Sequence, residues 1–192
     1  MERNRQTLWC ESRDMVTVLL FAGSARHGKT TACEIVKAKL EAHKRRVLII
    51  NYADYLKFIA KEYCGWNGQK DEAGRTLLQW LGTDKIRANC PDFWVDAVVR
   101  VIEALQDEFD VVCIGDVRFP NEIQKMKFNK SIDPISIHIE RLNFDNGLTP
   151  EQRKHPSENS LRYWDFDWYI KCESGVENLE REIDKMIEYY AL

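Results

Sequence analysis

The chain of 192 residues is long enough for one domain with a full-sized core, and its 44% hydrophobic and 11% aromatic content excludes a disordered chain. Its 28 basic and 31 acidic side chains leave a net charge of −3, which argues against an extended nucleic-acid-binding surface. No run of 18 apolar residues occurs, and the polar residues 1–14 are not expected to act as a signal peptide. Six cysteines without a CxxC pair or zinc-site spacing are typical of reduced thiols, so we expect a cytoplasmic protein.

Strands and helices are predicted to alternate along the chain. We expect strands at residues 15–21, 47–51, 110–115, 135–140 and 168–171, and helices at 28–43, 53–64, 72–81, 92–106, 121–128 and 176–190. A polar, loop-like segment at 141–164 separates the last two strands. Strands joined through helices form right-handed crossovers, which predicts an α/β fold with a largely parallel sheet covered on both faces. In such a sheet, ligands bind beyond the carboxyl ends of the strands.

The segment GSARHGKT, residues 23–30, follows the first predicted strand, opens the first helix and matches the phosphate-loop pattern G-x-x-x-x-G-K-[ST]. Its glycines permit positive φ and close backbone approach, so that successive N–H groups can surround a phosphate at the helix N-terminus. Lys29 is expected to reach the β- and γ-phosphates of a nucleotide, and the Thr30 hydroxyl to bind Mg²⁺. The residues predicted to contact the nucleotide phosphates are Gly23, Ser24, Ala25, Arg26, His27, Gly28, Lys29, Thr30 and Thr31.

Two charged residues of opposite sign, Asp116 and Arg118, stand at the end of the predicted strand 110–115. Alternate residues of an extended chain face the same way, and placing both charges at a buried strand end is costly unless a ligand needs them. We expect Asp116 to bind or support the Mg²⁺ of the phosphate loop, with capping of the following helix as the alternative. Arg118 is expected to contact a phosphate group.

A phosphate loop indicates a nucleotide but leaves the reaction open. A kinase for a phosphorylated acceptor needs basic side chains that converge from separate segments, together with a cover that excludes water. It needs no general base, because an acceptor phosphate is already a nucleophile at neutral pH. The candidate basic residues are Arg75, Arg87, Arg118, Arg141, Arg153 and Lys154. Each has an ordinary surface role as its alternative except Arg118, whose position at the strand end fixes its direction.

Seven segments, in order from about residue 15 to the C-terminus, resemble the phage-type deoxynucleoside monophosphate kinases: GSARHGKTT, YADYLK, RTLLQWLGTD, FWVDAV, DVRFPNEI, HPSEN and DFDWYI. The most specific are DVRFPNE and the spaced H-P-S-E. The resemblance implies a three-layer P-loop NTPase fold with a mostly parallel five-stranded sheet and a lid, of the nucleoside-monophosphate-kinase type, in one domain over residues 1–192. It also implies ATP and Mg²⁺ as cofactors, a deoxynucleoside monophosphate as small-molecule substrate, no nucleic-acid or membrane partner, a homodimer, and the host cytoplasm as location if the chain is phage-encoded.

The resemblance also implies residue roles, with an acceptor-binding segment at about 53–107 and a lid at about 141–164. The implied catalytic residues are Lys29, Asp116, Arg118 and Arg153, and the implied metal ligands are Thr30 and Asp116. The implied substrate-binding residues are Asp54, Lys57, Arg75, Gln79, Arg87, Trp94, Arg118, Glu122, Arg141 and Glu158. Ser174 and Gly175 resemble the loop that cups the adenine of ATP, although Ser-Gly before a helix is also ordinary capping.

Several alternatives stay open on the sequence alone. Arg75 and Gln79 lie one helical turn apart and either share a ligand or form an exposed helix face, and Trp94 either stacks on a base or packs in the core. Segment 65–75 shows no recognised base-reading motif. The sequence therefore leaves the acceptor open among dGMP, dTMP and a 5-hydroxymethylated pyrimidine nucleotide. The alternative functions are another small-molecule P-loop kinase, similar to dephospho-coenzyme A kinase, and an ATP-binding switch without catalysis.

Overall fold

A five-stranded parallel sheet with the strand order β2-β3-β1-β4-β5 forms the centre of the fold. The computed structural model describes residues 15–69 and 71–192. The strands are β1 Val16–Ala22, β2 Val47–Ile49, β3 Val111–Val117, β4 Ile132–Arg141 and β5 Trp168–Cys172. The prediction of a parallel sheet is therefore confirmed, and β1 at its centre carries the phosphate loop at its carboxyl end.

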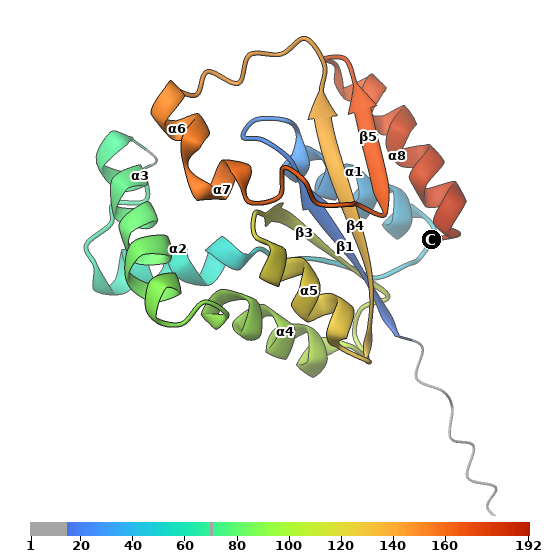
Figure 1. Ribbon diagram of the computed structural model, residues 1–192. Helices are drawn as coiled ribbons and strands as arrows, with labels where there is room; N and C mark the ends of the chain where they lie inside the picture. Colours follow the sequence, from blue (N-terminus) through green and yellow to red (C-terminus); the bar gives the residue numbers. More distant parts are fainter. Residues whose placement is uncertain (1–14, 70) are drawn as a thin grey trace, which may run out of the picture.

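Helices cover both faces of this sheet, as predicted (Figure 1). They are α1 Lys29–Ala42, α2 Tyr52–Tyr63, α3 Glu72–Gln79, the π-helix η1 Trp80–Arg87, α4 Phe93–Leu105, α5 Pro120–Phe128, α6 Pro150–Lys154, α7 Pro156–Asn159 and α8 Val176–Tyr190. Leu19 and Phe21 of β1 pack toward α1 and α8, whereas Val18 and Leu20 pack toward α4 and α5. This alternation explains why β1 is apolar at nearly every position, because a strand buried on both faces has no solvent side.

The observed β4 is longer than the predicted strand 135–140, since it pairs with β1 from Ile132 onward. Pro134 in the added stretch would argue against a strand in the middle of a sheet. However, β5 pairs with β4 only from Ile137 onward, so Pro134 lies where β4 has a neighbour on one side only. The missing N–H of a proline is tolerated there.

The segment between β4 and β5, predicted as a loop over residues 141–164, contains the two short helices α6 and α7. Each begins with a proline, and each has a side-chain cap, Thr149 for α6 and His155 for α7. Figure 1 shows this segment passing over the carboxyl-end side of the sheet. We call residues 141–164 the lid segment. None of the helices in the described part of the chain is long and apolar enough to cross a membrane.

Candidate active site

A cavity of about 700 Å³ lies at the carboxyl ends of β1 and β3. Its lining comes from the loop at residues 23–30, the starts of α1 and α2, α3, η1, α4, the turn between β3 and α5, the start of α5, and Ser157 of the lid segment. Segments far apart in the sequence meet here because the carboxyl ends of parallel strands share one edge of the sheet. The cavity is therefore the first place to look for the predicted site residues.

The loop at residues 23–30 has a backbone that requires its glycines. Gly23 has φ +139°, and a Cβ placed on it would lie 2.3 Å from the carbonyl oxygen of Ile139. Gly28 has φ +93° and Arg26 has φ 65°, so the loop turns through the left-handed region twice in three residues. Such a backbone turns successive N–H groups inward to form an anion-binding concavity.

Lys29 is buried at the first position of α1, where its Nζ donates hydrogen bonds to the carbonyl oxygens of Gly23 (2.7 Å) and Ser24 (2.8 Å). Burial, followed by the nearby charge of Arg118, lowers the pKa of Lys29 to about 8. The amine thus lies inside its own loop, bonded to backbone oxygens. A phosphate in the loop would offer this amine a full negative charge in place of two carbonyl dipoles.

Asp116 connects β3 to the start of α2. Its Oδ1 accepts a hydrogen bond from the N–H of Tyr52 (3.0 Å) and its Oδ2 accepts one from the N–H of Ala53 (2.9 Å). Burial nevertheless raises the pKa of this carboxyl, because desolvation outweighs the two backbone N–H groups. Asp116 therefore satisfies the first amides of α2, a helix earlier in the chain, while also lining the cavity together with Thr30.

Arg118 connects β3 to the lid segment. Its Nη1 donates to the carbonyl oxygen of Ser157 (3.1 Å) and forms an ion pair with Oε1 of Glu158. The second carboxylate oxygen of Glu158, Oε2, accepts a hydrogen bond from the N–H of Ala25 in the loop (3.1 Å). One lid carboxylate thus joins the guanidinium of Arg118 to the backbone of the loop.

Glu122 in α5 holds a second arginine at the cavity. Its Oε1 accepts from Nη2 of Arg87 (2.6 Å), and its Oε2 accepts from the N–H groups of Arg118 (2.7 Å) and Phe119 (3.0 Å). The Arg87 guanidinium also lies 4.0 Å from the centre of the Phe119 ring. Burial raises the pKa of Glu122 to about 7, against the opposing effect of the Arg87 charge. Glu122 therefore fixes both Arg87 and the turn that carries Arg118.

The sequence model of the deoxynucleotide monophosphate kinase family matches residues 46–183, well over half of the chain. This chain belongs to the deoxynucleotide monophosphate kinase family. The matched range begins after the phosphate loop, so the loop and the family match are independent observations that agree. They make the chain an ATP-dependent nucleotide kinase. A search of curated proteins finds no match.

Solved structures of the APS kinase CysC from Mycobacterium tuberculosis share the fold. A cysteine-to-alanine mutant of that kinase aligns with a TM-score of 0.52 at 13% identity, covering 91% of this chain and 98% of the other. A complex of the same kinase with AMPPNP and APS aligns with a TM-score of 0.55 at 12% identity and the same coverage. Similarity at this level of identity supports the P-loop kinase fold alone.

The cavity of this family member brings together some of the residues that were predicted to bind the acceptor nucleotide. Lys57, Arg87, Arg118 and Glu122 line it together with the phosphate loop. Trp94 also lines it, although it is only 3% exposed and its Nε1 donates to the carbonyl oxygen of Gly82 (3.0 Å). Trp94 thus packs in the core, as one of the two alternatives expected, and also forms part of the cavity wall.

Other predicted acceptor residues lie elsewhere. Arg75 and Gln79 are exposed on α3, whose contribution to the cavity lining is Leu78. Asp54 lies in the first turn of α2, where its carboxylate accepts from the N–H of Asn51 and from Nζ of Lys57, both at 2.9 Å. The Lys57 amine therefore reaches the cavity wall with its own counter-ion beside it.

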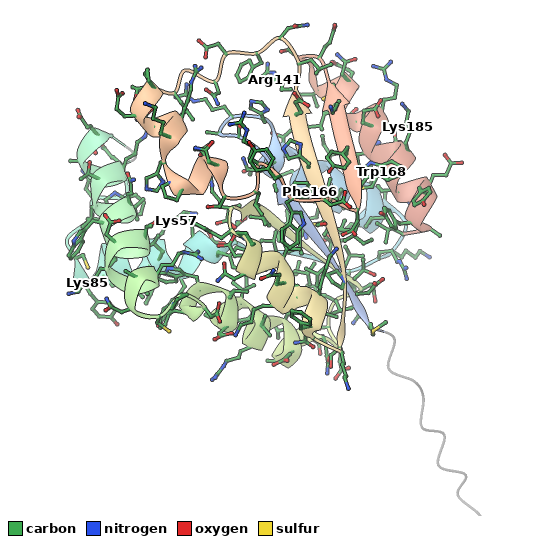
Figure 2. All side chains as sticks on the ribbon, viewed as in Figure 1. Lys57, Lys85, Arg141, Phe166, Trp168 and Lys185 are labelled. Atoms are coloured by element: carbon green, nitrogen blue, oxygen red, sulfur yellow. The ribbon has the colours of Figure 1, made fainter. Side chains whose placement is uncertain are left out.

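Arg141 lies beside the predicted adenine loop. Its Nε donates to the Ser174 hydroxyl (2.7 Å), its N–H donates to Nδ1 of His27 (3.0 Å), and its guanidinium lies 3.9 Å from the centre of the Phe144 ring. Figure 2 shows Arg141 at the end of β4, well separated from Lys57 on α2. The exposed Gly175 follows Ser174 at the start of α8.

Arg153 is held within the lid segment. Its Nη2 donates to the Asp145 carboxylate (2.8 Å) and its Nε donates to the carbonyl oxygen of Leu148 (3.0 Å). It lines a smaller cavity of about 300 Å³ with Ser24 and Glu158, beside the phosphate loop.

Asn51 is a cavity residue that sequence reasoning missed. It follows β2, and its Oδ1 accepts a hydrogen bond from the N–H of Gly115 (3.0 Å), which links the ends of β2 and β3. A Cβ on Gly115 would lie 3.1 Å from Sγ of Cys33 and 3.4 Å from Oδ1 of Asn51. An asparagine between a strand and a helix was a readable capping signal. The bond to Gly115, 64 residues away, was not visible in the sequence.

Proposed function

We propose that this chain transfers the γ-phosphate of ATP to the 5′-phosphate of a deoxynucleoside monophosphate, with release of ADP and the deoxynucleoside diphosphate. The observation that carries the proposal is that one cavity is lined by the phosphate loop and by Lys57, Arg87 and Arg118. A nucleoside triphosphate and a second anionic ligand, bound side by side, require several positively charged groups in one cavity. The dGMP, dTMP and 5-hydroxymethylated pyrimidine nucleotides remain the acceptor candidates.

In this proposal the triphosphate lies in the phosphate loop, and Lys29 exchanges the carbonyl oxygens of Gly23 and Ser24 for phosphate oxygens. An oxygen of the acceptor phosphate attacks the γ-phosphorus, and the bond from that phosphorus to the bridging oxygen of ADP breaks. Arg87, fixed by Glu122 and Phe119, holds the acceptor phosphate, while Arg118 stabilises the group in transit. Arg141 and Ser174 lie on the adenine side of ATP, rather than at the acceptor.

Thr30 and Asp116 fit a magnesium ion. Both line the cavity, and both offer the hard oxygen donors that Mg²⁺ prefers. Within residues 15–69 and 71–192, no group of three or more metal-ligating His, Cys, Asp or Glu side chains occurs. That is compatible with an ion held by one or two protein oxygens together with nucleotide phosphates. When bound, Mg²⁺ neutralises charge on the β- and γ-phosphate oxygens.

A coupled ADP-release assay tests this proposal. Purified protein with Mg·ATP is given each deoxynucleoside and ribonucleoside monophosphate in turn, including 5-hydroxymethylated pyrimidines, with a control that lacks acceptor. We expect ADP only in the presence of particular deoxynucleotides, and none from a Lys29→Ala variant that keeps the wild-type melting temperature. ADP release that is independent of acceptor would instead indicate an ATPase or a switch.

A further inference from the structure

Both oxygens of the Glu158 carboxylate are bound by groups that the proposed function assigns to phosphates. Oε2 accepts a hydrogen bond from the N–H of Ala25 in the phosphate loop (3.1 Å), and Oε1 forms an ion pair with the guanidinium of Arg118. The Glu158 side chain is 12% exposed. A carboxylate that accepts hydrogen bonds from a loop amide and from an arginine offers these donors anionic oxygens, as a phosphate does, with a single negative charge.

Glu158 belongs to α7, in the lid segment, so this contact also determines where the lid lies (Figure 1). Two further contacts hold the same segment to the site. Nη1 of Arg118 donates to the carbonyl oxygen of Ser157 (3.1 Å), and Nη1 of Arg26 donates to that of Asn146 (3.0 Å). Of these three lid contacts, the one made by Glu158 places a negative charge on the phosphate-binding groups, whereas the other two involve carbonyl oxygens.

We propose that Glu158 is an internal anion that occupies part of the phosphate site in the ligand-free kinase and that incoming phosphate displaces. This inference rests on the proposed function, because it takes the loop and Arg118 to be phosphate ligands. The displaced side chain has room to move, since Glu158 also lines a cavity of about 360 Å³, which extends to His138 and Leu161. Arg162 and Glu140 both line that cavity, so the freed carboxylate has a positive charge available there as well as a negative one.

Displacement of an internal anion weakens the apparent affinity for phosphate, because ligand binds only the fraction of molecules whose site is free. Removing the charge of Glu158 should therefore tighten phosphate binding. A carboxylate that instead stabilised the bound state, by holding Arg118 or the closed lid in place, would have the opposite effect when removed. The sign of the change in affinity separates these two roles.

The test is titration calorimetry of inorganic tripolyphosphate into the wild type, Glu158→Gln and Glu158→Ala. The control is Glu151→Gln, which removes a charge from an exposed position of the same lid segment. We expect both Glu158 variants to bind about fivefold to tenfold more tightly than the wild type, in proportion to a lost charge-assisted contact, and the control to match the wild type. Two variants are used so that a folding defect in one leaves the other to decide.

Unchanged or weaker binding by a folded Glu158 variant would overturn the inference. The proposed function has its own readout in this experiment, since Lys29→Ala should lose tripolyphosphate binding. Wild-type binding that is lost in Lys29→Ala, with no gain in the Glu158 variants, would reject the internal anion alone. Equal binding by the wild type and Lys29→Ala would reject the phosphate-loop assignment on which both depend.

Discussion

Replacing Glu122 with glutamine should change how the stability of the kinase depends on pH. The Glu122 side chain is 2% exposed, and burial raises its pKa from 4.5 to about 7. Between these two values the folded protein binds the Glu122 proton more tightly than the unfolded chain does. The contribution of this group to stability is therefore fully present below the lower pKa and is lost as the pH rises through the higher one.

The size of the effect follows from the shift in pKa. A shift of one pKa unit corresponds to about 1.4 kcal/mol of unfolding free energy, so the whole shift of Glu122 corresponds to about 3 kcal/mol. Most of this contribution is lost between about pH 5 and about pH 8. A glutamine at this position cannot titrate, although it still offers an oxygen to a backbone N–H. The difference in unfolding free energy between the wild type and Glu122→Gln (wild type minus variant) should therefore decrease by about 2 to 3 kcal/mol as the pH rises from about 5 to about 8.

Urea unfolding at a series of pH values measures both free energies, and the titrating groups that the two proteins share largely cancel in the difference. A difference that stays constant with pH would show that Glu122 titrates normally, as an exposed carboxylate does. A difference that rises with pH would show that the pairing with Arg87 outweighs burial. Either result would refute the reasoning.

Three further predictions concern the loop and the two substrates. Gly23→Ala forces a Cβ against a carbonyl oxygen of β4, so we expect a loss of about 1 to 3 kcal/mol in unfolding free energy and a loss of turnover; a stable, active variant would contradict the loop geometry. In two-substrate kinetics, Arg141→Ala should raise KM for ATP about tenfold with little effect on KM for the acceptor, and Lys57→Ala should do the reverse. Equal effects of either variant on both KM values would contradict the assignment of Arg141 to ATP and of Lys57 to the acceptor. Arg118→Ala should lower kcat by about 100-fold while ATP still binds, whereas the exposed Arg75→Ala should match the wild type; full activity of Arg118→Ala would exclude it from the reaction.

The parallel sheet and the phosphate loop could be predicted because their signals are local. A run of apolar residues followed by G-x-x-x-x-G-K-[ST] specifies a buried strand, a turn and a helix within 30 residues or so. The limits of β4 could not be predicted in this way, because its first residues are a strand only by pairing with β1. The two short lid helices were missed because each is stabilised mainly by its cap and first-turn proline, with little apolar periodicity to detect.

The partners of the site residues could not be predicted, since they depend on contacts between distant segments. Asp116 was expected at a metal or at the following helix, and it binds amides of α2, more than 60 residues earlier in the chain. Glu122 was expected at the substrate; it lines the cavity, and its carboxylate joins Arg87 to the turn after β3. Charge and spacing predicted a set of candidate site residues, whereas only the three-dimensional structure showed which of them meet.

Transfer of label from ATP radiolabelled on its γ-phosphate is the most direct test of the central proposal. The protein is incubated with labelled Mg·ATP and the deoxynucleoside monophosphate that supports ADP release, and the products are separated by chromatography. The account predicts label in the deoxynucleoside diphosphate, in amounts equal to the ADP formed, and none with Lys29→Ala. Label that appears as inorganic phosphate, with the monophosphate unchanged, would contradict it.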